Sequence, residues 1–163
     1  RPIKNYNSNS PEEKIDTWDQ IQISHDKHPI LIAIRKKILE MFPNSSQNFL
    51  RITTTRYKKG SGAPLHHDYN EEGLDIFTKT KGHRMLHTCL LYLNDDFEGG
   101  ETFFLLVNKM IYPKKGKLLI FSSHDENEKL NLLSMHEGLK VKSGIKYILQ
   151  VWIMNIKQFD FEY

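Results

Sequence analysis

The stretch Ile145-Lys146-Tyr147-Ile148-Leu149-Gln150-Val151-Trp152-Ile153-Met154 predicts a strand and favours a largely β fold. Side chains in a strand point alternately to two faces. One face carries Ile145, Tyr147, Leu149, Val151 and Ile153, and the other carries Lys146, Ile148, Gln150, Trp152 and Met154. A lysine on such an apolar face is costly to bury without an anionic partner. Taken alone, the pattern favours the simpler interpretation, in which the Lys146 amine reaches solvent at the strand end.

The rest of the chain supplies further strands and one clear helix. Strands are predicted at 50–57, 86–93, 101–107, 117–121 and 145–154, with turn residues between them. A helix that begins at Pro29 and ends before Pro43 is predicted to pack on a sheet through Ile30, Ile34, Ile38, Met41 and Phe42. One helix followed by many strands predicts a mainly β, α+β fold with flanking helices. The expected architecture is a double-stranded β-helix, a jelly roll of the cupin type.

Length and composition fit one domain. The 163 residues are expected to form a single catalytic domain, 1–163, in which residues 1–20 are a loosely structured lead-in. The net charge of +3 is too small to predict a nucleic-acid partner, and no apolar run approaches the roughly 18 residues of a membrane span. The single cysteine, Cys89, is expected to be buried and precludes an internal disulfide. This favours a cytoplasmic, reducing compartment slightly and leaves a secretory compartment open; the oligomeric state stays unknown.

A His-x-Asp pair is the strongest chemical signal. His66 and Asp68 follow the small-residue stretch 60–65, and His136 lies far downstream. In an extended segment, residues two apart point to one face, so His66 and Asp68 can reach one metal while His67 points away. Two histidines and a carboxylate form the ligand set that holds non-haem Fe(II) and leaves positions open for a co-substrate and O2. His66, Asp68 and His136 are therefore the predicted metal ligands.

Other interpretations of these polar residues stay open. A His-x-Asp pair occurs often by chance, and Asp68 equally suits a turn that leads into Tyr69-Asn70. His83 and His87 have the spacing of a helical metal pair, but at a strand onset they would lie roughly 13 Å apart. His124-Asp125 is a rival ligand pair. The polar stretches 69–83 and 122–133 are predicted as mobile loops around the mouth of the site.

As a set, the motifs of this chain resemble the prolyl 4-hydroxylase family of 2-oxoglutarate- and Fe(II)-dependent dioxygenases over residues 30–153. The matching pieces are Arg56-Tyr57, Gly60, His66, Asp68, Arg84, Thr88, Leu91-Tyr92-Leu93-Asn94-Asp95, Glu98-Gly99-Gly100-Glu101-Thr102-Phe103, Pro113-Lys114-Lys115-Gly116, Leu119-Ile120-Phe121, His136-Glu137-Gly138, Val141, Gly144-Ile145-Lys146-Tyr147 and Trp152-Ile153. The glycine after His136 and the spacing to Lys146 favour His136 over His124 as the third ligand.

The resemblance implies a reaction and its central residues. His66, Asp68 and His136 would bind Fe(II), and Lys146 would pair with the far carboxylate of 2-oxoglutarate. A prolyl residue of a peptide or protein would be hydroxylated to 4-hydroxyproline, while 2-oxoglutarate and O2 give succinate and CO2. L-Ascorbate would keep the iron reduced. The expected partner is a proline-containing polypeptide.

The resemblance also implies supporting roles. Tyr57 would hydrogen-bond 2-oxoglutarate, Thr88 would assist it, and Trp152 would line the same pocket. The chain departs from the family at Ala63, where many members have a second tyrosine near the substrate. The stretch 61–64 is small and is expected to be flexible instead, which leaves the substrate open.

Three alternatives remain at this point. A related oxygenase would act on lysyl residues, on another side chain or on a nucleobase; the pieces at 67–68 and 136–139 also resemble lysyl hydroxylases, which typically carry arginine in place of Lys146. A non-catalytic binding domain would keep only the fold. A cupin-type metal protein would bind no 2-oxoglutarate and would not need Lys146 or Tyr57.

Overall fold

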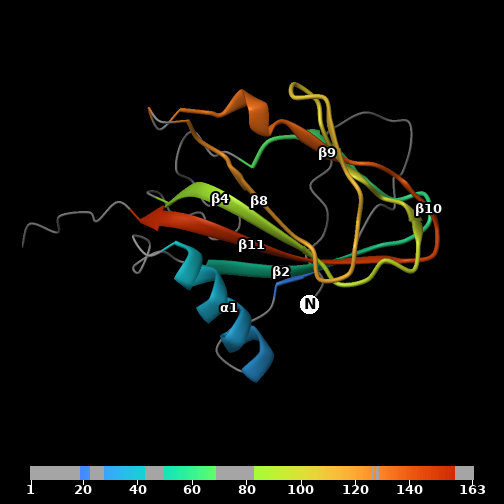
Figure 1. Cartoon of the computed structure of the whole chain (residues 1–163), viewed down its shortest axis with the longest axis horizontal. Helices are drawn as coiled ribbons and strands as arrows, with labels where there is room; N and C mark the ends of the chain where they lie inside the picture. The colour runs from blue at the N-terminus through green and yellow to red at the C-terminus, as the bar shows by residue number, and fades with distance from the viewer. Residues whose placement is uncertain are drawn as a thin grey trace, which may run out of the picture.

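The computed structural model describes residues 19–22, 28–42, 50–68, 83–125, 127 and 129–156, which form a mainly β protein with one long helix (Figure 1). Its elements are β1 (Asp19–Gln22), α1 (Pro29–Met41), β2 (Leu50–Tyr57), β3 (Ala63–His66), β4 (His83–Tyr92), β5 (Glu98–Gly99), β6 (Thr102–Phe104), β7 (Lys109–Ile111), β8 (Leu118–Ser122), η2 (Leu132–Ser134), β9 (His136–Gly138), β10 (Val141–Ser143) and β11 (Lys146–Ile156). The predicted loop at 69–83 lies outside the described residues except for its last residue, which begins β4.

Two antiparallel sheets build the protein. The large sheet has the order β1-β2-β11-β4-β8, the small sheet has the order β3-β9-β6-β7, and β5 pairs with β10. From β2 to β11 the chain crosses repeatedly between the large and small sheets, as it does in a jelly roll. The longest strand, β11, pairs with β2 on one side and β4 on the other, so it lies in the middle of the large sheet.

The helix α1 covers the outer face of the large sheet (Figure 1). His28 precedes the helix, and its Nδ1 accepts a hydrogen bond from the amide of Ile30, while Pro29 occupies the first helical position. The helix bounds agree with the prediction, but its buried stripe does not. Ile30 and Met41 are 63% and 47% exposed, whereas Leu31 is buried.

The error in the helix comes from its phase. Leu31 and Ile38 are buried against the sheet, and Ile34, Leu39 and Phe42 pack beside them. Leu31, Ile34 and Ile38 are spaced by three and four residues and therefore share one face, while Ile30 lies about 100° further around the helix. The buried stripe is centred on Leu31 and Ile38, so the predicted stripe, which included Ile30 and Met41, was rotated around the helix axis from the observed one.

The two faces predicted for β11 are confirmed. Leu149, Val151 and Ile153 join the cluster beneath α1, together with Ile52 and Cys89. Ile148 joins the second cluster, with Tyr57, Leu90, Tyr92 and Val141. This cluster lies on the inner side of the large sheet, in the space between the two sheets that is called the barrel interior below. Cys89 is fully buried, as expected, and burial raises the pKa of its thiol to about 11.

Strand predictions succeeded for four of the five strands of the large sheet and failed for β1 and several short segments. Residues 50–57 form β2 as predicted, and β4, β8 and β11 differ from their predictions by a few residues at the ends. The predicted strand 101–107 is wrong beyond Phe104, because the chain turns at 105–108 and Asn108 adopts a positive φ of 48°. Strand β1 extends into the supposed lead-in 1–20; residues 1–18 lie outside the described part. The segment 122–133 contains a His124–Leu130 bridge and runs into η2, so it is not wholly a loop.

The stretch 61–64, expected to be flexible, is tied to its neighbours by hydrogen bonds. The amide of Ser61 donates to the Lys58 carbonyl, and the Ser61 carbonyl accepts from the amide of Val141. Gly62 has no room for a side chain, because a Cβ atom there would lie 2.5 Å from the Gly138 carbonyl oxygen. This close approach brings β3 beside β9, and Ala63 is paired with Gly138.

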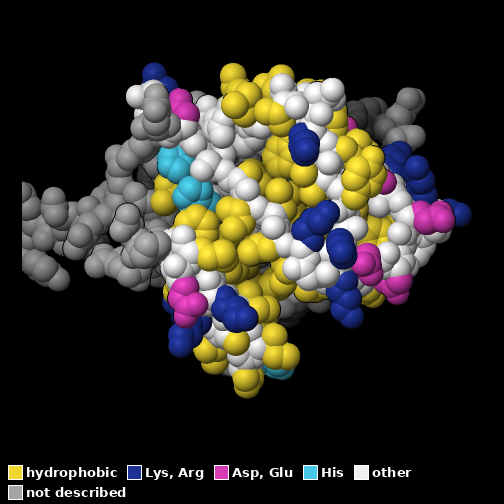
Figure 2. All heavy atoms as spheres, in the orientation of Figure 1, with side chains coloured by type: hydrophobic (Ala, Val, Ile, Leu, Met, Phe, Trp, Pro, Cys, Tyr) yellow, Lys and Arg dark blue, Asp and Glu magenta, His cyan; other side chains and the backbone are white. Residues whose placement is uncertain are grey.

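Charged side chains on the surface are mixed in sign. Figure 2 shows Lys and Arg side chains distributed singly or in small groups among hydrophobic and acidic ones on the face it presents. Among the described residues, no helix is both long and apolar enough to cross a membrane.

Candidate metal centre and co-substrate pocket

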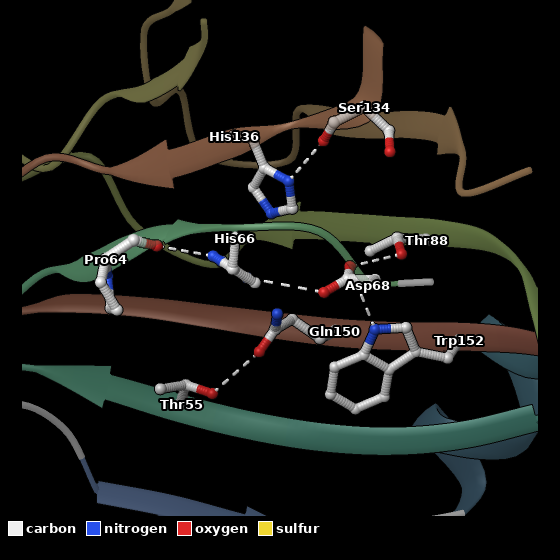
Figure 3. A network of polar contacts seen from close by, with 9 residues as sticks. All are labelled: Thr55, Pro64, His66, Asp68, Thr88, Ser134, His136, Gln150 and Trp152. Carbon is white, nitrogen blue, oxygen red and sulfur yellow. Dashed lines mark hydrogen bonds and ion pairs between the residues drawn. The ribbon is translucent and has the colours of Figure 1, made fainter. Parts of the chain in front are cut away.

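His66, Asp68 and His136 converge at one end of the small sheet (Figure 3). His66 ends β3 and His136 begins β9, and the two residues are partners across that strand pair. Asp68 follows two residues after His66. One ligand atom from each residue lies within 4.8 Å of the others, and this is the one group of three or more such residues found in the described part of the chain.

Both histidines are oriented by backbone carbonyls. The Nδ1 of His66 lies 2.7 Å from the Pro64 carbonyl oxygen, and the Nδ1 of His136 lies 2.9 Å from that of Ser134. A carbonyl only accepts, so each Nδ1 carries the hydrogen and each Nε2 keeps its lone pair. The Nε2 of His66 also lies 3.5 Å from Oδ1 of Asp68. Two electron-rich atoms that face each other at this distance favour a cation between them.

Asp68 is fixed from the other sheet. Its Oδ2 accepts a 2.6 Å hydrogen bond from the hydroxyl of Thr88 and a 3.3 Å hydrogen bond from the indole Nε1 of Trp152. Thr88 was predicted to assist 2-oxoglutarate binding and Trp152 to line its pocket, and both roles stay predictions. In this structure their polar atoms reach the carboxylate of Asp68, whose side chain is 8% exposed (Figure 3).

The donor set fits Fe(II). Two imidazole nitrogens and one carboxylate, each held by a second hydrogen bond, form the arrangement that non-haem iron sites use. His136 is buried between Phe104 and Phe121, whose ring centroids lie 5.6 and 4.8 Å from its own. Burial lowers the pKa of His136, opposed by the charge of Asp68, so burial favours the neutral imidazole that a metal requires.

Lys146 occupies the interior of the same barrel. Its side chain is 3% exposed, and its Nζ donates a 2.7 Å hydrogen bond to the Gly100 carbonyl oxygen. The Nζ also lies 5.1 Å from the ring centroid of Tyr57 and 5.6 Å from that of Tyr92. Within the described residues, no carboxylate lies at ion-pair distance from this amine. Burial lowers the pKa of Lys146 from 10.5 to about 8, and the charge of Glu101 opposes that shift.

The inner face of β11 connects Lys146 to the metal end. Lys146, Ile148, Gln150 and Trp152 alternate along that face, which Trp152 joins to Asp68 through its indole nitrogen. Tyr57 is the cross-strand partner of Lys146. Burial raises the pKa of the Tyr57 phenol, and the charge of Asp68 adds to that effect, so the phenol stays neutral and can donate a hydrogen bond.

Two buried polar pairs in this interior were not predicted. The Thr55 hydroxyl donates to Oε1 of Gln150 at 3.1 Å, and the hydroxyls of Tyr92 and Thr102 lie 2.8 Å apart. Gln150 was detectable in principle, because it alternates with Ile148 and Trp152 on the predicted inner face. Its partner on β2, Thr55, could not be predicted, because neither segment alone determines the register between the two strands.

The remaining histidines form no comparable metal group in the part of the chain that the structure describes. His67 is exposed, as predicted from its position between two residues that share the opposite face. The ring of His87 stacks on Phe42 and its Nδ1 lies 2.9 Å from the Ser122 hydroxyl, while His124 lies edge-on to it. Asp125, part of the rival ligand pair, accepts the amides of residues 127 and 129 with its Oδ1.

Comparison with known proteins identifies the family. A family profile described as the 2OG-Fe(II) oxygenase superfamily matches residues 52–154. The chain belongs to this superfamily. Its members use Fe(II), 2-oxoglutarate and O2, and the two facing sheets described above are its double-stranded β-helix, so the predicted fold and cofactors are confirmed.

Individual relatives of this chain are named as proline-modifying enzymes. Prolyl 4-hydroxylase 1 of Arabidopsis thaliana is 31% identical over 77% of this chain and 48% of its own length. A putative prolyl 4-hydroxylase of Acanthamoeba polyphaga mimivirus is 30% identical over 90% of this chain and 61% of its own. The chain thus spans about half to three fifths of these curated relatives.

A solved structure agrees with the fold in detail. The viral collagen prolyl hydroxylase of Paramecium bursaria Chlorella virus-1, in complex with 2-oxoglutarate, superimposes with a TM-score of 0.74 at 30% identity. The alignment covers 88% of this chain and 82% of the viral one. The likeness that the motifs indicated is therefore one of both sequence and backbone.

Proposed function

We propose that this oxygenase hydroxylates prolyl residues in a polypeptide. His66, Asp68 and His136 hold Fe(II), and Lys146 and Tyr57 bind 2-oxoglutarate. The observation that carries the proposal is the combination of three convergent ligand atoms with a buried lysine in the same barrel that has no carboxylate partner among the described residues. A buried ammonium of this kind suits a dicarboxylate that reaches it from the metal end.

The protein's own contribution is to position the reactants. When bound, Fe(II) and 2-oxoglutarate supply the oxidising chemistry, in which O2 is consumed, 2-oxoglutarate becomes succinate and CO2, and one oxygen atom enters a substrate C–H bond. The Pro64 and Ser134 carbonyls fix both histidines in the ligand tautomer. Phe104 and Phe121 exclude water from the buried side of His136.

Exposed apolar side chains at the metal end favour a polypeptide substrate over a nucleic acid. Phe104 is paired with His136, and the turn that follows it carries Leu105, Leu106 and Val107, which are 46–54% exposed. Leu132 and Leu133 of η2 are 58% and 56% exposed and precede His136 by only a few residues. A hydrogen bond from the Leu105 amide to the Met135 carbonyl joins the turn to this segment. Figure 2 shows hydrophobic side chains gathered along its upper edge, where these elements lie. Exposed apolar groups of this kind mark protein-binding surfaces.

Proline as the target is supported by the names of the relatives, and Ala63 bears on which proline is accepted. The chain carries a small residue where many prolyl 4-hydroxylases have tyrosine. Ala63 packs beside the interior cluster that contains Tyr57 and Ile148. Its small volume leaves more space near the co-substrate side of the barrel than a tyrosine would.

The test is an assay of product mass and succinate. The full chain would be incubated with Fe(II), 2-oxoglutarate, ascorbate, O2 and proline-containing peptides, with matched peptides that carry alanine for proline. We expect a gain of one oxygen on proline, located at C4 by amino-acid analysis, with one succinate per product. Equal turnover of the alanine peptides, or hydroxylation of lysyl peptides or oligonucleotides alone, would contradict the proposal. No succinate with any substrate would favour a binding domain that retained the fold.

A further inference from the structure

The carboxylate of Asp68 is held by two donors that both reach the same oxygen. Thr88 and Trp152 donate to Oδ2, and Oδ1 is the oxygen that faces Nε2 of His66. The 2.6 Å distance from the Thr88 hydroxyl is that of a charge-assisted hydrogen bond, whereas the 3.3 Å indole contact is longer and weaker.

Strand register explains why two donors meet one oxygen. Thr88 on β4 and Trp152 on β11 are direct cross-strand partners in the large sheet. Directly opposed residues point to the same face, so both side chains enter the barrel together. Asp68 approaches from the small sheet, two residues beyond β3. The hydroxyl is fully buried and the indole is 6% exposed, so neither donor can easily exchange its partner for bulk water.

We propose that Thr88 and Trp152 are positioning residues that restrict Asp68 to binding the metal through Oδ1 alone. A carboxylate oxygen has two lone-pair directions, and both on Oδ2 are used by these donors. Binding through both oxygens would require the 2.6 Å Thr88 hydrogen bond to break. The restriction keeps one coordination position free that a bidentate aspartate would occupy. This inference rests on the proposed iron site.

A merely structural role makes a different prediction. If the two hydrogen bonds only join the sheets, their removal lowers stability but leaves the metal's surroundings unchanged. Metal affinity and the absorption spectrum of the bound ion therefore separate the two roles. Supporting hydrogen bonds to metal ligands typically contribute about 10- to 100-fold in affinity.

The experiment titrates the whole chain with Co(II), a spectroscopic probe, without 2-oxoglutarate. Thr88→Val keeps the shape of threonine and removes the hydroxyl, and Thr88→Ser restores it. We expect Thr88→Val to weaken Co(II) binding by about 10- to 100-fold and to change the intensity of the d–d bands, which reports coordination number. Thr88→Ser should return both towards the wild-type values, and Trp152→Phe should give a smaller loss.

A matched control separates this effect from the general loss of a buried hydroxyl. Thr102→Val removes a buried hydrogen bond to Tyr92 and leaves Asp68 untouched. It should leave the Co(II) affinity unchanged. If Thr88→Val bound Co(II) with wild-type affinity and spectrum, the positioning role would be overturned, but the proposed metal site would not. If Thr88→Val does not fold, Trp152→Phe provides the test. An unchanged Co(II) spectrum in Trp152→Phe would overturn the proposal that both donors restrict Asp68 to Oδ1, and a changed spectrum would support it. No Co(II) binding by the wild type would overturn the metal site itself.

Discussion

The two faces of β11 are equally buried but chemically different. On the outer face, Leu149, Val151 and Ile153 are at most 3% exposed and contact α1 and the aliphatic cluster beneath it. On the inner face, Lys146 and Trp152 are 3% and 6% exposed, yet each directs a nitrogen to an acceptor on another segment. One strand therefore contributes both to the hydrophobic core and to the candidate site.

The outer face of β11 stabilises the fold, whereas the inner face contains a group that destabilises it. The outer face gains from apolar burial, on the order of 1.5–3 kcal/mol for each large aliphatic side chain. The inner face keeps a desolvated ammonium at Lys146, which opposes folding unless an anion joins it. Function and stability should therefore respond oppositely to substitutions only two or three residues apart.

The largest expected effect is the loss of a metal ligand. His66→Ala should abolish Fe(II) binding, a loss well beyond the roughly 10- to 100-fold attributed to a supporting hydrogen bond. His67→Ala is the matched control. The imidazole of His67 is exposed, so its removal should leave Fe(II) binding intact. Anaerobic titration monitored by equilibrium dialysis measures both. Loss of iron in His67→Ala alone would mean that the wrong histidine had been chosen.

Lys146→Met should separate binding from stability most clearly. Removing one partner of a buried ion pair costs about 3–5 kcal/mol, so 2-oxoglutarate affinity should fall by on the order of 100-fold or more. The ligand-free protein should become about 1–3 kcal/mol more stable, because a buried charge has been replaced by an apolar side chain. Calorimetry and urea unfolding measure the two effects.

Lys142→Met, at an exposed position on β10, serves as the control for Lys146→Met and should change neither quantity appreciably. Unchanged 2-oxoglutarate affinity in Lys146→Met would rule out the assigned role of this amine.

Ile153→Ala should have the reverse pattern on the outer face. The side chain is fully buried, so its truncation should lower the free energy of unfolding by about 2–4 kcal/mol. The folded fraction should bind 2-oxoglutarate as the wild type does. Urea unfolding and calorimetry at low temperature provide the comparison. A large loss of affinity in the folded protein would show that the two faces are not independent.

The smallest effect is a pH dependence that belongs to the inner face alone. The ammonium of Lys146 binds the dicarboxylate, and its pKa in the ligand-free protein is about 8. Affinity for 2-oxoglutarate should therefore fall by about tenfold per pH unit above 8, with little change between pH 6 and 7. Lys146→Arg, whose guanidinium stays charged, should lose this dependence if it still binds. A flat profile in the wild type would contradict the assignment.

Stability should change in the opposite direction over the same range. The folded pKa of Lys146 lies below its ordinary value of 10.5, so between pH 8 and 10.5 the unfolded chain binds more protons than the folded chain. The destabilisation caused by burying this ammonium is therefore full below pH 8 and is relieved as the pH rises to 10.5, so stability rises with pH across that window. The difference in unfolding free energy between wild type and Lys146→Met measures it, and a constant difference would contradict it.

Patterns local to one segment were the ones that the sequence allowed us to predict. The alternation in β11 and the spacing of His66 and Asp68 follow from backbone geometry, and both agree with the structure. The position of His136 beside them depended on the resemblance to a family, because pairing between β3 and β9 is not encoded by either segment alone.

What was missed also depends on pairing between segments. The hydrogen bonds from Thr88 and Trp152 to Asp68 were not predicted, because they follow from the β4–β11 register. The short strands β5, β7, β9 and β10 contain two or three residues each, too few for a recognisable period. The turn after Phe104 was missed because its leucines suggest a strand, whereas they are exposed beside the metal end.

The most direct test of the account is an anaerobic titration of the chain with Fe(II) and 2-oxoglutarate, monitored for the visible metal-to-ligand charge-transfer band. The account predicts a saturable band in the wild type, its loss in His136→Ala, and a requirement for much more 2-oxoglutarate in Lys146→Met. Absence of the band in a folded wild-type protein supplied with iron would contradict the claim that the metal end and Lys146 form one site.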